Sequence, residues 1–366
     1  MKLKAIIADD MVLFRRLLSD AMSSLPDVEV AGVAANGAIA LRLLEEKKAD
    51  VVFMDVYMPE MDGLEALKRI RISNPATQVI MVSGVADREA DVVIGALRMG
   101  ALDFIRKPAG PNATANLMTL RKDVERALDV VRARLAPGYK PRARLSTTAQ
   151  APGKATAAAP VAARPKVEPG QFSLLAIGSS TGGPEALAKI IPLLPAGFPL
   201  PVVIVQHMPP VFTAVLAENL ARQSRIRVRE AADGDRLESG LALIAPGGRH
   251  MTVKKNGGGY LVELNDGQPE NSCRPSVDVL FRSLAETFAD KWVLSLVLTG
   301  MGQDGMKGVE ILRKKNKCLS LVQSRETCVI YGMPRAVEEN GLADRAVHLD
   351  EIARELAALA SKNNSI

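Results

Sequence analysis

The segment "IGSSTGGP" at residues 177–184 places two serines in a glycine-rich turn, straight after an apolar run. Residues 178–182 match the pattern G-x-S-x-G, which holds its central serine out of a sharp strand-to-helix turn. Such a turn can also bind a phosphate with its backbone amides. The segment lacks both the Gly-Lys-Ser/Thr ending and the G-x-G-x-x-G spacing of phosphate-binding loops, so we favour Ser180 as a nucleophile.

A nucleophilic serine needs a base, and the chain has three histidines. His207 directly follows the apolar "PVVIVQ", which places it at the carboxyl end of the next expected strand, on the same edge as Ser180. His250, after "APGGR", is the competing base, and His348 is read as a capping or surface residue. Asp304 in "LTGMGQDG" follows a further strand and can orient the imidazole, although aspartate before glycine is also common in turns.

Acidic residues gather at strand ends in the first half of the chain. Asp9 and Asp10 follow the first expected strand, Asp55 closes the third, Ser83 follows the fourth and Lys107 the fifth. In a parallel sheet these side chains converge on one edge. Mutual repulsion between the carboxylates is offset by a bound cation, and oxygen ligands suit Mg²⁺. A carboxylate held in this way, Asp55, can act as a nucleophile toward a phosphoryl group.

The elements that must position these residues alternate regularly between strand and helix. In the first half we expect strands at residues 4–8, 28–34, 50–54, 78–82 and 103–106. In the second half we expect them at 174–177, 202–206, 241–245, 293–299 and 318–323, with a β-hairpin whose turn is 256–259 in "KKNGGGYLVELND". Strict alternation predicts an α/β protein made of two doubly wound parallel-sheet domains, one flavodoxin-like and one Rossmann-like.

The length of 366 residues, 48% of them hydrophobic, suits two domains that each bury a core. Residues 135–171 are mostly Pro, Ala, Gly, Ser and Thr with scattered bases, which predicts a flexible linker. A nucleic-acid-binding tail is the rival interpretation, but the stretch lacks aromatics that stack on bases. We therefore expect an N-terminal domain at 1–134 and a C-terminal domain at 172–366.

The charge distribution argues against a basic nucleic-acid-binding surface. The net charge is +6, yet residues 132–170 carry eight bases against one acid, which leaves the remainder at −1. The longest apolar runs fall short of the ~20 residues of a membrane-spanning helix, and two carboxylates appear within ten residues of the start, unlike a signal peptide. The three cysteines lack metal-ligand spacing, which indicates reduced thiols and a cytoplasmic protein.

Residues 1 to about 132 resemble the receiver domains of two-component response regulators. The matching segments are "ADD" at 8–10, "MDVYMPEMDG" at 54–63, "VSG" at 82–84 and "DFIRKP" at 103–108. The resemblance implies that Asp55 accepts a phosphoryl group and that Asp9, Asp10 and Asp55 hold Mg²⁺. It further implies that Ser83 and Lys107 contact the phosphate and that Phe104 is the aromatic that rotates on switching. Met11 departs from the pattern, in which a small or polar residue is more usual.

The second half resembles the bacterial chemotaxis protein-glutamate methylesterases of the CheB family. Its order of Ser, His, Asp differs from the Ser, Asp, His order of the α/β-hydrolases. The matching segments are "AIGSSTGGPEAL" at 176–187, "QHMPPVFTAVLAENL" at 206–220, "APGGRHM" at 245–251, "CRPSVDVLFRSLA" at 273–285, "LTGMGQDGMKG" at 298–308 and "YGMPRAV" at 331–337.

This second resemblance implies that Ser180 is the nucleophile, His207 the base and Asp304 the residue that orients the base. It also implies that the backbone amide of Met301 stabilises the oxyanion, and that the ester chemistry needs no cofactor. Ser179 stands where the family often has alanine, and Cys273 stands where it often has histidine, so residue 273 cannot be a base here.

The two resemblances together imply a phosphorylation-activated serine hydrolase of chemotaxis. Its substrates are methylated glutamates and certain glutamines of chemoreceptors, and a chemotaxis histidine kinase supplies the phosphoryl group. No nucleic acid and no membrane insertion is expected. Two alternatives remain: a response regulator whose second half is a protein-binding module with a degenerate site, and, more weakly, a DNA-binding output domain, for which neither net positive charge nor a helix-turn-helix pattern is present.

Overall fold

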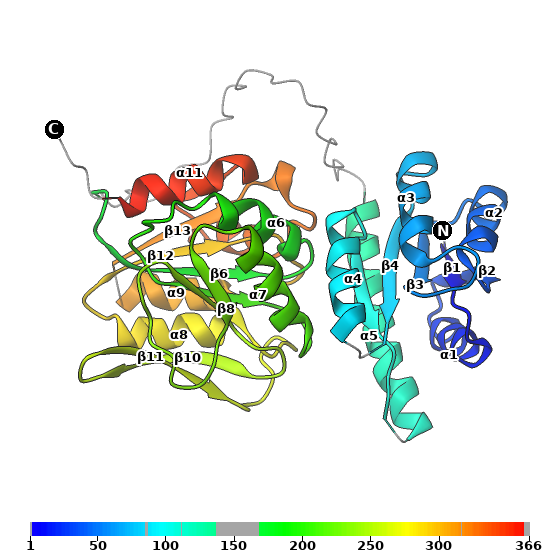
Figure 1. Cartoon of the computed structure of the whole chain (residues 1–366), viewed down its shortest axis with the longest axis horizontal. Coiled ribbons are helices and arrows are strands. Elements are labelled where there is room, and N and C mark those ends of the chain that lie inside the picture. Colours follow the sequence, from blue (N-terminus) through cyan, green and yellow to red (C-terminus); the bar gives the residue numbers. More distant parts are fainter. Residues whose placement is uncertain (1, 85–86, 111, 137–167, 316, 362–366) are drawn as a thin grey trace, which may run out of the picture. The chain divides into compact units, whose positions relative to one another are not determined.

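The computed structural model of this protein describes residues 2–84, 87–110, 112–136, 168–315 and 317–361. The chain divides into two compact units, Met1–Tyr139 and Lys140–Ile366 (Figure 1). Most of the linker expected at 135–171, together with the flexibility ascribed to it, lies outside the described residues, and the domain limits set from the sequence stay predictions.

The N-terminal unit is a five-stranded parallel sheet with helices on both faces, in the order β2-β1-β3-β4-β5. Helices α1 and α5 contact each other on one face, and α2 contacts α3 on the other. This is the flavodoxin-like order that the sequence predicted. Its elements are β1 (Leu3–Ala8), α1 (Val12–Ser23), β2 (Val28–Ala34), α2 (Gly37–Lys47), β3 (Val51–Asp55), α3 (Gly63–Ser73), β4 (Gln78–Ser83), α4 (Asp87–Arg98), β5 (Asp103–Arg106) and α5 (Ala113–Leu135).

The C-terminal unit is a seven-stranded parallel sheet in the order β14-β13-β12-β6-β7-β9-β8. Its strands are β6 (Phe172–Ser179), β7 (Val202–Gln206), β8 (Arg227–Glu230), β9 (Leu241–Ile244), β12 (Trp292–Val297), β13 (Lys317–Gln323) and β14 (Arg345–Val347). Its helices are α6 (Gly183–Ile190), η1 (Ile191–Leu193), α7 (Phe212–Gln223), α8 (Val277–Thr287), α9 (Met306–Lys315), η2 (Arg325–Thr327), α10 (Met333–Glu339) and α11 (Leu349–Ala360).

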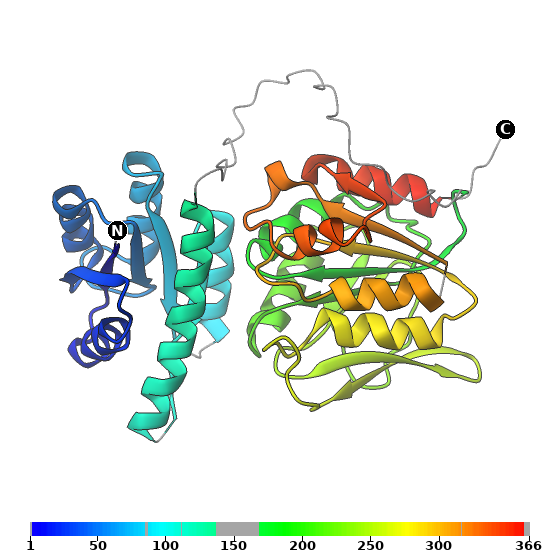
Figure 2. The same cartoon turned by 180° about the vertical axis from the view of Figure 1, so that it is seen from behind.

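The layers of the C-terminal unit are plain in the cartoon. Helices α6 and α11 pack together on one face of the sheet, and α8 and α9 pack side by side on the other (Figure 2). The expected hairpin, β10 (His250–Asn256) and β11 (Gly259–Asn265), lies over α8 as an additional layer (Figure 1). Its turn pairs Asn256 with Gly259, as the sequence predicted.

Strand burial explains why the sequence was informative. Strands β3, β4, β7 and β9 are buried along their whole length, which fits parallel strands covered by helices on both faces. Such strands appear in the sequence as continuous apolar runs, and all ten expected strands are present. Two strands were missed, β8 and β14. Both lie at the sheet edges, are short and carry arginines.

Polar caps fix several helix starts next to these strands. The side chains of Asn36, Asp62 and Ser276 accept backbone N–H bonds from the first turns of α2, α3 and α8. Because α2 and α3 follow β2 and β3, the caps Asn36 and Asp62 also fix loops at the carboxyl edge of the N-terminal sheet.

Both sheets reverse their strand order at one place, and the residues of interest lie there. In the N-terminal unit the reversal is between β1 and β3, next to Asp9 and Asp55. In the C-terminal unit it is between β6 and β12, next to Ser180 and Thr299. Crevices at the carboxyl ends of such strands are where open α/β sheets bind their ligands.

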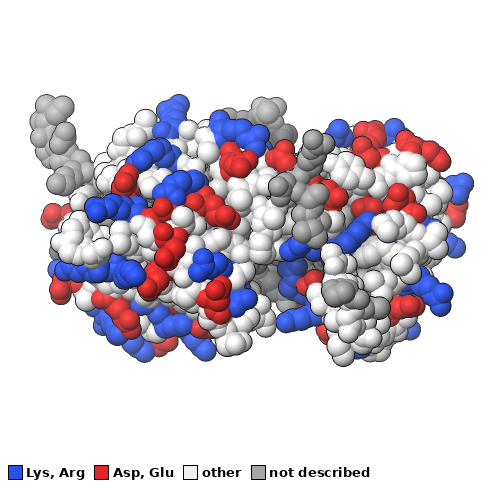
Figure 3. Space-filling model, turned by 60° about the horizontal axis from the view of Figure 1, so that its bottom comes forward, with Lys and Arg blue, Asp and Glu red and all other residues white. Residues whose placement is uncertain are grey.

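The surface in Figure 3 shows Lys and Arg interspersed with Asp and Glu on each unit, with no extended patch of one sign among the described residues on that face. Within the described ranges, no helix combines the length and the apolar character that crossing a bilayer requires.

Gly178 in β6 has no room for a side chain, because a Cβ there would lie 2.4 Å from Cγ1 of Val277 at the start of α8. We expect Gly178→Ala to lower the free energy of unfolding of the C-terminal unit by about 1–3 kcal/mol through overpacking. The fluorescence of Trp292, the single tryptophan of the chain, reports that unit's denaturation.

Gly197→Ala is the matched control, since a Cβ at Gly197 would have no neighbour within 4 Å. Its effect should stay within about 0.5 kcal/mol. Equal effects of the two substitutions would contradict the close packing of β6 against α8.

Candidate functional site

The turn after β6 is held by backbone bonds on both sides of Ser180. The amide of Ser180 donates to the carbonyl of Thr299 at 3.0 Å, and the amide of Gly183 donates to the carbonyl of Ser180 at 2.7 Å. Gly182 adopts a φ of 80°, where glycine is favoured, and a Cβ there would lie 2.5 Å from Val329. The sequence therefore needs glycine here to present the serine in a tight strand-to-helix turn.

The two adjacent serines have different environments. Ser179 is completely buried, and its hydroxyl donates to Oε1 of Gln206 at 2.7 Å. Nε2 of Gln206 in turn donates to the carbonyl of Ser180 at 2.9 Å. The hydroxyl of Ser180 has no hydrogen-bond partner within the described part of the chain. The hydroxyl of Ser179 is thus part of the internal hydrogen bonding of the turn, whereas that of Ser180 is not.

Asp304 lies in the loop between β12 and α9 and is almost wholly buried. Its Oδ2 accepts from Nε2 of His207 at 2.7 Å and from the amide of Val277 at 2.7 Å. Its Oδ1 accepts from the Ser276 hydroxyl at 2.8 Å, the Asn271 side chain at 2.8 Å and the Asp278 amide at 3.1 Å. Burial alone would raise the pKa of Asp304, but His207 and the two amides hold it well below its ordinary value.

Asp278 mirrors this arrangement from the first turn of α8. Its Oδ1 accepts from the amides of Gly305 at 2.9 Å and Gly308 at 2.6 Å, at the start of α9, and its Oδ2 accepts from Asn271 at 3.0 Å. Asp304 therefore caps α8, the helix that contains Asp278, and Asp278 caps α9, the helix that follows Asp304. Burial, followed by the charge of Asp304, raises the pKa of Asp278 to about 6.

His207 is fixed through both ring nitrogens. With Asp304 ionised and accepting only, Nε2 carries the proton that it donates, so Nδ1 is the nitrogen that gains or loses a proton when the ring titrates. Nδ1 lies 3.4 Å from the Sγ of Cys273. Burial lowers the pKa of His207, but the charge of Cys273 and the bond to Asp304 outweigh burial and raise it to about 10. The structure brings His207 and Asp304 together as expected, but shows no bond from His207 to Ser180 among the described residues.

The competing histidines have structural roles. His250 is buried, donates from Nε2 to the carbonyl of Gln268 at 3.0 Å and accepts at Nδ1 from the amide of Ser276 at 3.2 Å. Both nitrogens are therefore used in holding the start of α8. His348 caps α11, as the sequence suggested, by accepting from the amide of Asp350 at 3.4 Å.

The loop after β12 passes directly beside Ser180. A Cβ on Gly300 would lie 2.7 Å from the Cβ of Ser180, so that backbone and side chain are in contact. The next amide, that of Met301, has no acceptor within the described residues. An unpaired amide next to a serine is what an oxyanion-binding role requires.

In the N-terminal unit, the three expected carboxylates are close together. Oxygen atoms of Asp9, Asp10 and Asp55 all lie within 4.8 Å of one another. The Lys107 ammonium lies 2.7 Å from Oδ2 of Asp9 and 2.8 Å from Oδ2 of Asp55, and so offsets part of their charge. Burial, reinforced by the charge of Asp9 and opposed by Lys107, raises the pKa of Asp55 to about 7.

The two remaining residues predicted for this unit are also at or near that edge. Ser83 is fully buried, its hydroxyl lies 3.1 Å from Oε2 of Glu89, and its carbonyl accepts from the amide of Lys107 at 2.7 Å. Phe104 is buried within β5.

Sequence reasoning did not identify Asn271, Ser276, Asp278 or Gln206 as parts of the C-terminal site. Each except Asn271 lies in a quoted motif, but nothing in the motifs alone tells a cap from a core position. Asn271 and Glu89 gave no signal.

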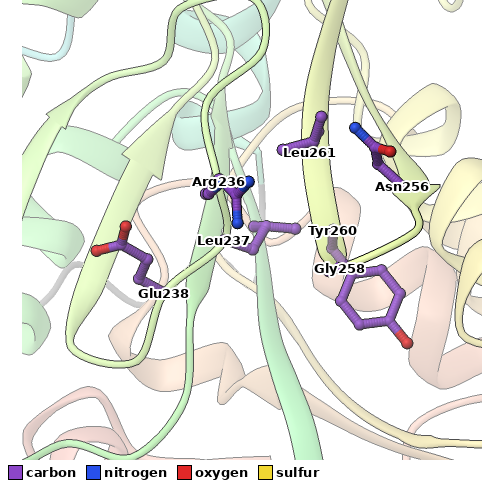
Figure 4. Close-up of a pocket in the computed structure, with 8 residues that line it drawn as sticks. Arg236, Leu237, Glu238, Asn256, Gly258, Tyr260 and Leu261 are labelled. Carbon is purple, nitrogen blue, oxygen red and sulfur yellow. The ribbon is translucent and has the colours of Figure 1, made fainter.

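A pocket of about 260 Å³ lies at the other end of the C-terminal unit, where the turn of the hairpin faces the segment before β9 (Figure 4). It is near the amino end of β9, whereas the site residues are at the carboxyl ends of the strands. Its lining residues are Arg236, Leu237, Glu238, Asn256, Gly258, Gly259, Tyr260 and Leu261.

Comparison with known proteins gives concordant results for both units. The model of the CheB methylesterase family matches residues 175–356, and that of the response regulator receiver domain matches residues 5–119. Proteins named protein-glutamate methylesterase/protein-glutamine glutaminase are similar over nearly the whole chain. The one from Desulfotalea psychrophila is 38% identical and aligns over 97% of both chains; that from Trichodesmium erythraeum is 40% identical, over 97% of this chain and 98% of its own.

Among solved structures, the catalytic domain of the Thermotoga maritima CheB methylesterase is 40% identical in sequence. It covers 51% of this chain and 97% of its own, with a TM-score of 0.49.

The reciprocal caps predict that Asp278→Ala destabilises the C-terminal unit. The substitution leaves the buried amides of Gly305 and Gly308 without their acceptor, which should cost about 3 kcal/mol. Urea denaturation followed by Trp292 fluorescence measures the loss.

Glu286→Ala, at an exposed position of the same helix, is the control and should change stability by no more than about 0.5 kcal/mol. The pKa of Asp278 in the folded state, about 6, exceeds its ordinary value of 3.8, so the wild type loses stability as the pH rises through that interval. The cost of Asp278→Ala should therefore be larger at pH 4.5 than at pH 7; a cost that grows with pH would contradict this assignment.

Proposed function

Because the chain belongs to the CheB family of protein-glutamate methylesterases, we propose that its C-terminal unit is a serine hydrolase acting on glutamate methyl esters and glutamines of chemoreceptors. The observation that carries the proposal is the free hydroxyl of Ser180 on the strand edge that also bears the His207–Asp304 pair, bonded at 2.7 Å.

In the proposed reaction, the Ser180 oxygen attacks the γ-carbonyl carbon of the modified side chain. Its proton passes to Nδ1 of His207, because Nε2 is already bonded to Asp304. Asp304 holds the ring in that tautomer and stabilises the imidazolium that forms. The amide of Met301 donates to the oxyanion.

Collapse of the tetrahedral intermediate expels the leaving group, which takes the proton from His207. Methanol leaves from an ester and ammonia from a glutamine, and both leave the same glutamyl ester on Ser180. Water, activated by His207 in turn, hydrolyses that ester to glutamate and restores the serine. One set of residues thus supports both activities in the names of the relatives.

The N-terminal unit is proposed to accept a phosphoryl group on Asp55 from a chemotaxis histidine kinase. The three close carboxylates fit a hard divalent cation, and Asp9, Asp10 and Asp55 would hold Mg²⁺. When bound, Mg²⁺ offsets the charge of the incoming phosphoryl group and of the acceptor. Lys107 is placed to contact the phosphoryl oxygens, since its ammonium already lies 2.8 Å from Asp55.

Phosphorylation of Asp55 is proposed to activate the esterase, with Ser83 and Phe104 as the residues that respond. Ser83 is suited to this because its hydroxyl, now 3.1 Å from the Glu89 carboxylate, can turn toward a phosphoryl group instead. The protein is accordingly proposed to act in the cytoplasm, in bacterial chemotaxis, where demethylation and deamidation of receptors serve adaptation.

We expect Ser180→Ala to lower methanol release from methylated chemoreceptor membranes by at least about 10³-fold. Ser179→Ala is the control and should retain most activity, since its hydroxyl is bonded to Gln206 and buried. Loss of activity in Ser179→Ala, with activity retained in Ser180→Ala, would show that the nucleophile is Ser179. Wild-type protein that releases no methanol would favour a regulated binding module instead.

A second experiment tests the receiver. Wild-type activity should rise with Mg²⁺ and acetyl phosphate and fall back when EDTA is added, whereas Asp55→Asn should show one rate with or without phosphodonor. Asp62→Asn, a nearby carboxylate whose capping bond to Glu65 an amide can also make, should still respond. Equal stimulation of Asp55→Asn would rule out Asp55 as the acceptor.

A further inference from the structure

Cys273 is placed beside His207 by a tight turn. Glu270 and Cys273 pair through two backbone bonds of 3.0 and 2.9 Å, and the two residues between them, Asn271 and Ser272, have φ angles of 52° and 62°. Two successive positive φ angles are typical of a type I′ turn. The turn is anchored on both sides.

One anchor is Asn271, whose side chain donates to both Asp304 and Asp278. The other is Glu270, which forms a two-point pair with Arg282 of α8 at 2.6 and 2.5 Å. The turn that carries the Cys273 thiol is therefore held in part by Asp304, the carboxylate that also bonds to the imidazole.

The thiol occupies the nitrogen that the proposed reaction needs. Nε2 of His207 is bonded to Asp304, and the Sγ of Cys273 lies 3.4 Å from Nδ1. A neutral imidazole has one acceptor lone pair in its plane, so one donor at a time can bond to Nδ1. In this structure the partner of Nδ1 is the Sγ of Cys273, and the hydroxyl of Ser180 is without a bond among the described residues.

We propose that Cys273 is a positioning residue for His207, which holds Nδ1 in the resting enzyme and must yield it to Ser180 before the ester is attacked. This inference rests on the proposed esterase function and adds to it a competition between a thiol and a hydroxyl for one base. The proton that Cys273 shares stays on sulfur or moves to Nδ1, and in the second case His207 cannot accept a proton from Ser180.

The charged groups around the imidazole make this competition depend on pH. Asp304 faces Nε2 and Cys273 faces Nδ1. Farther from the ring, Asp278 shares Asn271 with Asp304, and the Glu270–Arg282 pair adjoins the turn of Cys273. His250 contacts the amide of Ser276, whose hydroxyl bonds to Asp304. Burial lowers the pKa of His207, and the charge of Cys273 is the leading influence that raises it, to about 10. Removing the thiol should therefore lower the pKa of His207.

Histidine-labelled NMR of the full chain tests the contact without any assay of activity. The chain has three histidines, so His207→Gln assigns the signal by its absence. In Cys273→Ala and in Cys273→Ser, the His207 signal should titrate about 1 pH unit or more lower than in the wild type. The exposed His348 serves as internal reference.

Cys318→Ala is the matched control, because this buried thiol contacts Ser295 and lies outside the site. It should leave the titration of His207 where it is in the wild type. An unchanged His207 titration in both Cys273 variants, or an equal shift in Cys318→Ala, would overturn the proposal.

The activity arm uses methanol release as a function of pH. In Cys273→Ala the acid limb should move to lower pH, and the rate at pH 7 should rise several-fold, because Ser180 no longer competes for Nδ1. A purely structural role would lower the rate without moving the limb, and that result would also overturn the proposal. Wild-type protein with no activity but a thiol-dependent His207 titration would contradict the esterase function and leave the Cys273–His207 contact standing.

Discussion

The carboxylate of Asp304 is the group on which the C-terminal site depends. It accepts five hydrogen bonds, from His207, Val277, Asp278, Ser276 and Asn271. A buried charge is costly unless its lone pairs are satisfied, so each of these donors must be in place before the site can form. The cap of α8, the turn before Cys273 and the orientation of the imidazole are consequences of meeting that one requirement. His250 helps to hold the start of α8, since its Nδ1 accepts a hydrogen bond from the amide of Ser276.

Much of this arrangement was predictable because it depends on strand ends. Short β-branched and apolar runs, alternating with helical segments, predicted ten strands of the two parallel sheets. Once the sheets were parallel, Ser180, His207 and Asp304 had to share an edge, as did Asp9, Asp55 and Lys107. The edge strands β8 and β14 escaped notice because short, arginine-bearing strands lack that apolar signal. The choice between His207 and His250 needed contacts, since both follow strands or loops at the same edge. The catalytic roles themselves stay predictions, as does the linker at 135–171.

The two units solve one electrostatic problem in different ways. Both gather carboxylates where the strand order reverses, and both must offset the repulsion between them. In the N-terminal unit the ammonium of Lys107 bridges Asp9 and Asp55, and the pKa of Asp55 remains raised to about 7. In the C-terminal unit, backbone amides at the starts of α8 and α9 offset the repulsion by donating to the two carboxylates. Asp304 stays ionised, while the pKa of Asp278 rises to about 6. The charge at the N-terminal site is thus offset by a side chain, and that at the C-terminal site by backbone amides whose positions the fold sets.

Because Asp304 caps α8 and Asp278 caps α9, the stability of these two helix starts and the geometry of the site depend on the same hydrogen bonds. Neither helix can fray at its first turn without releasing the carboxylate that caps the other, so the two ends should open together as one cooperative unit. Amide hydrogens of the first turns, though about thirty residues apart in sequence, would then exchange with solvent at a common rate, since one opening event exposes both. Opening of either helix start also frees Asp304 from donors, so a form opened at these turns would not retain an oriented imidazole.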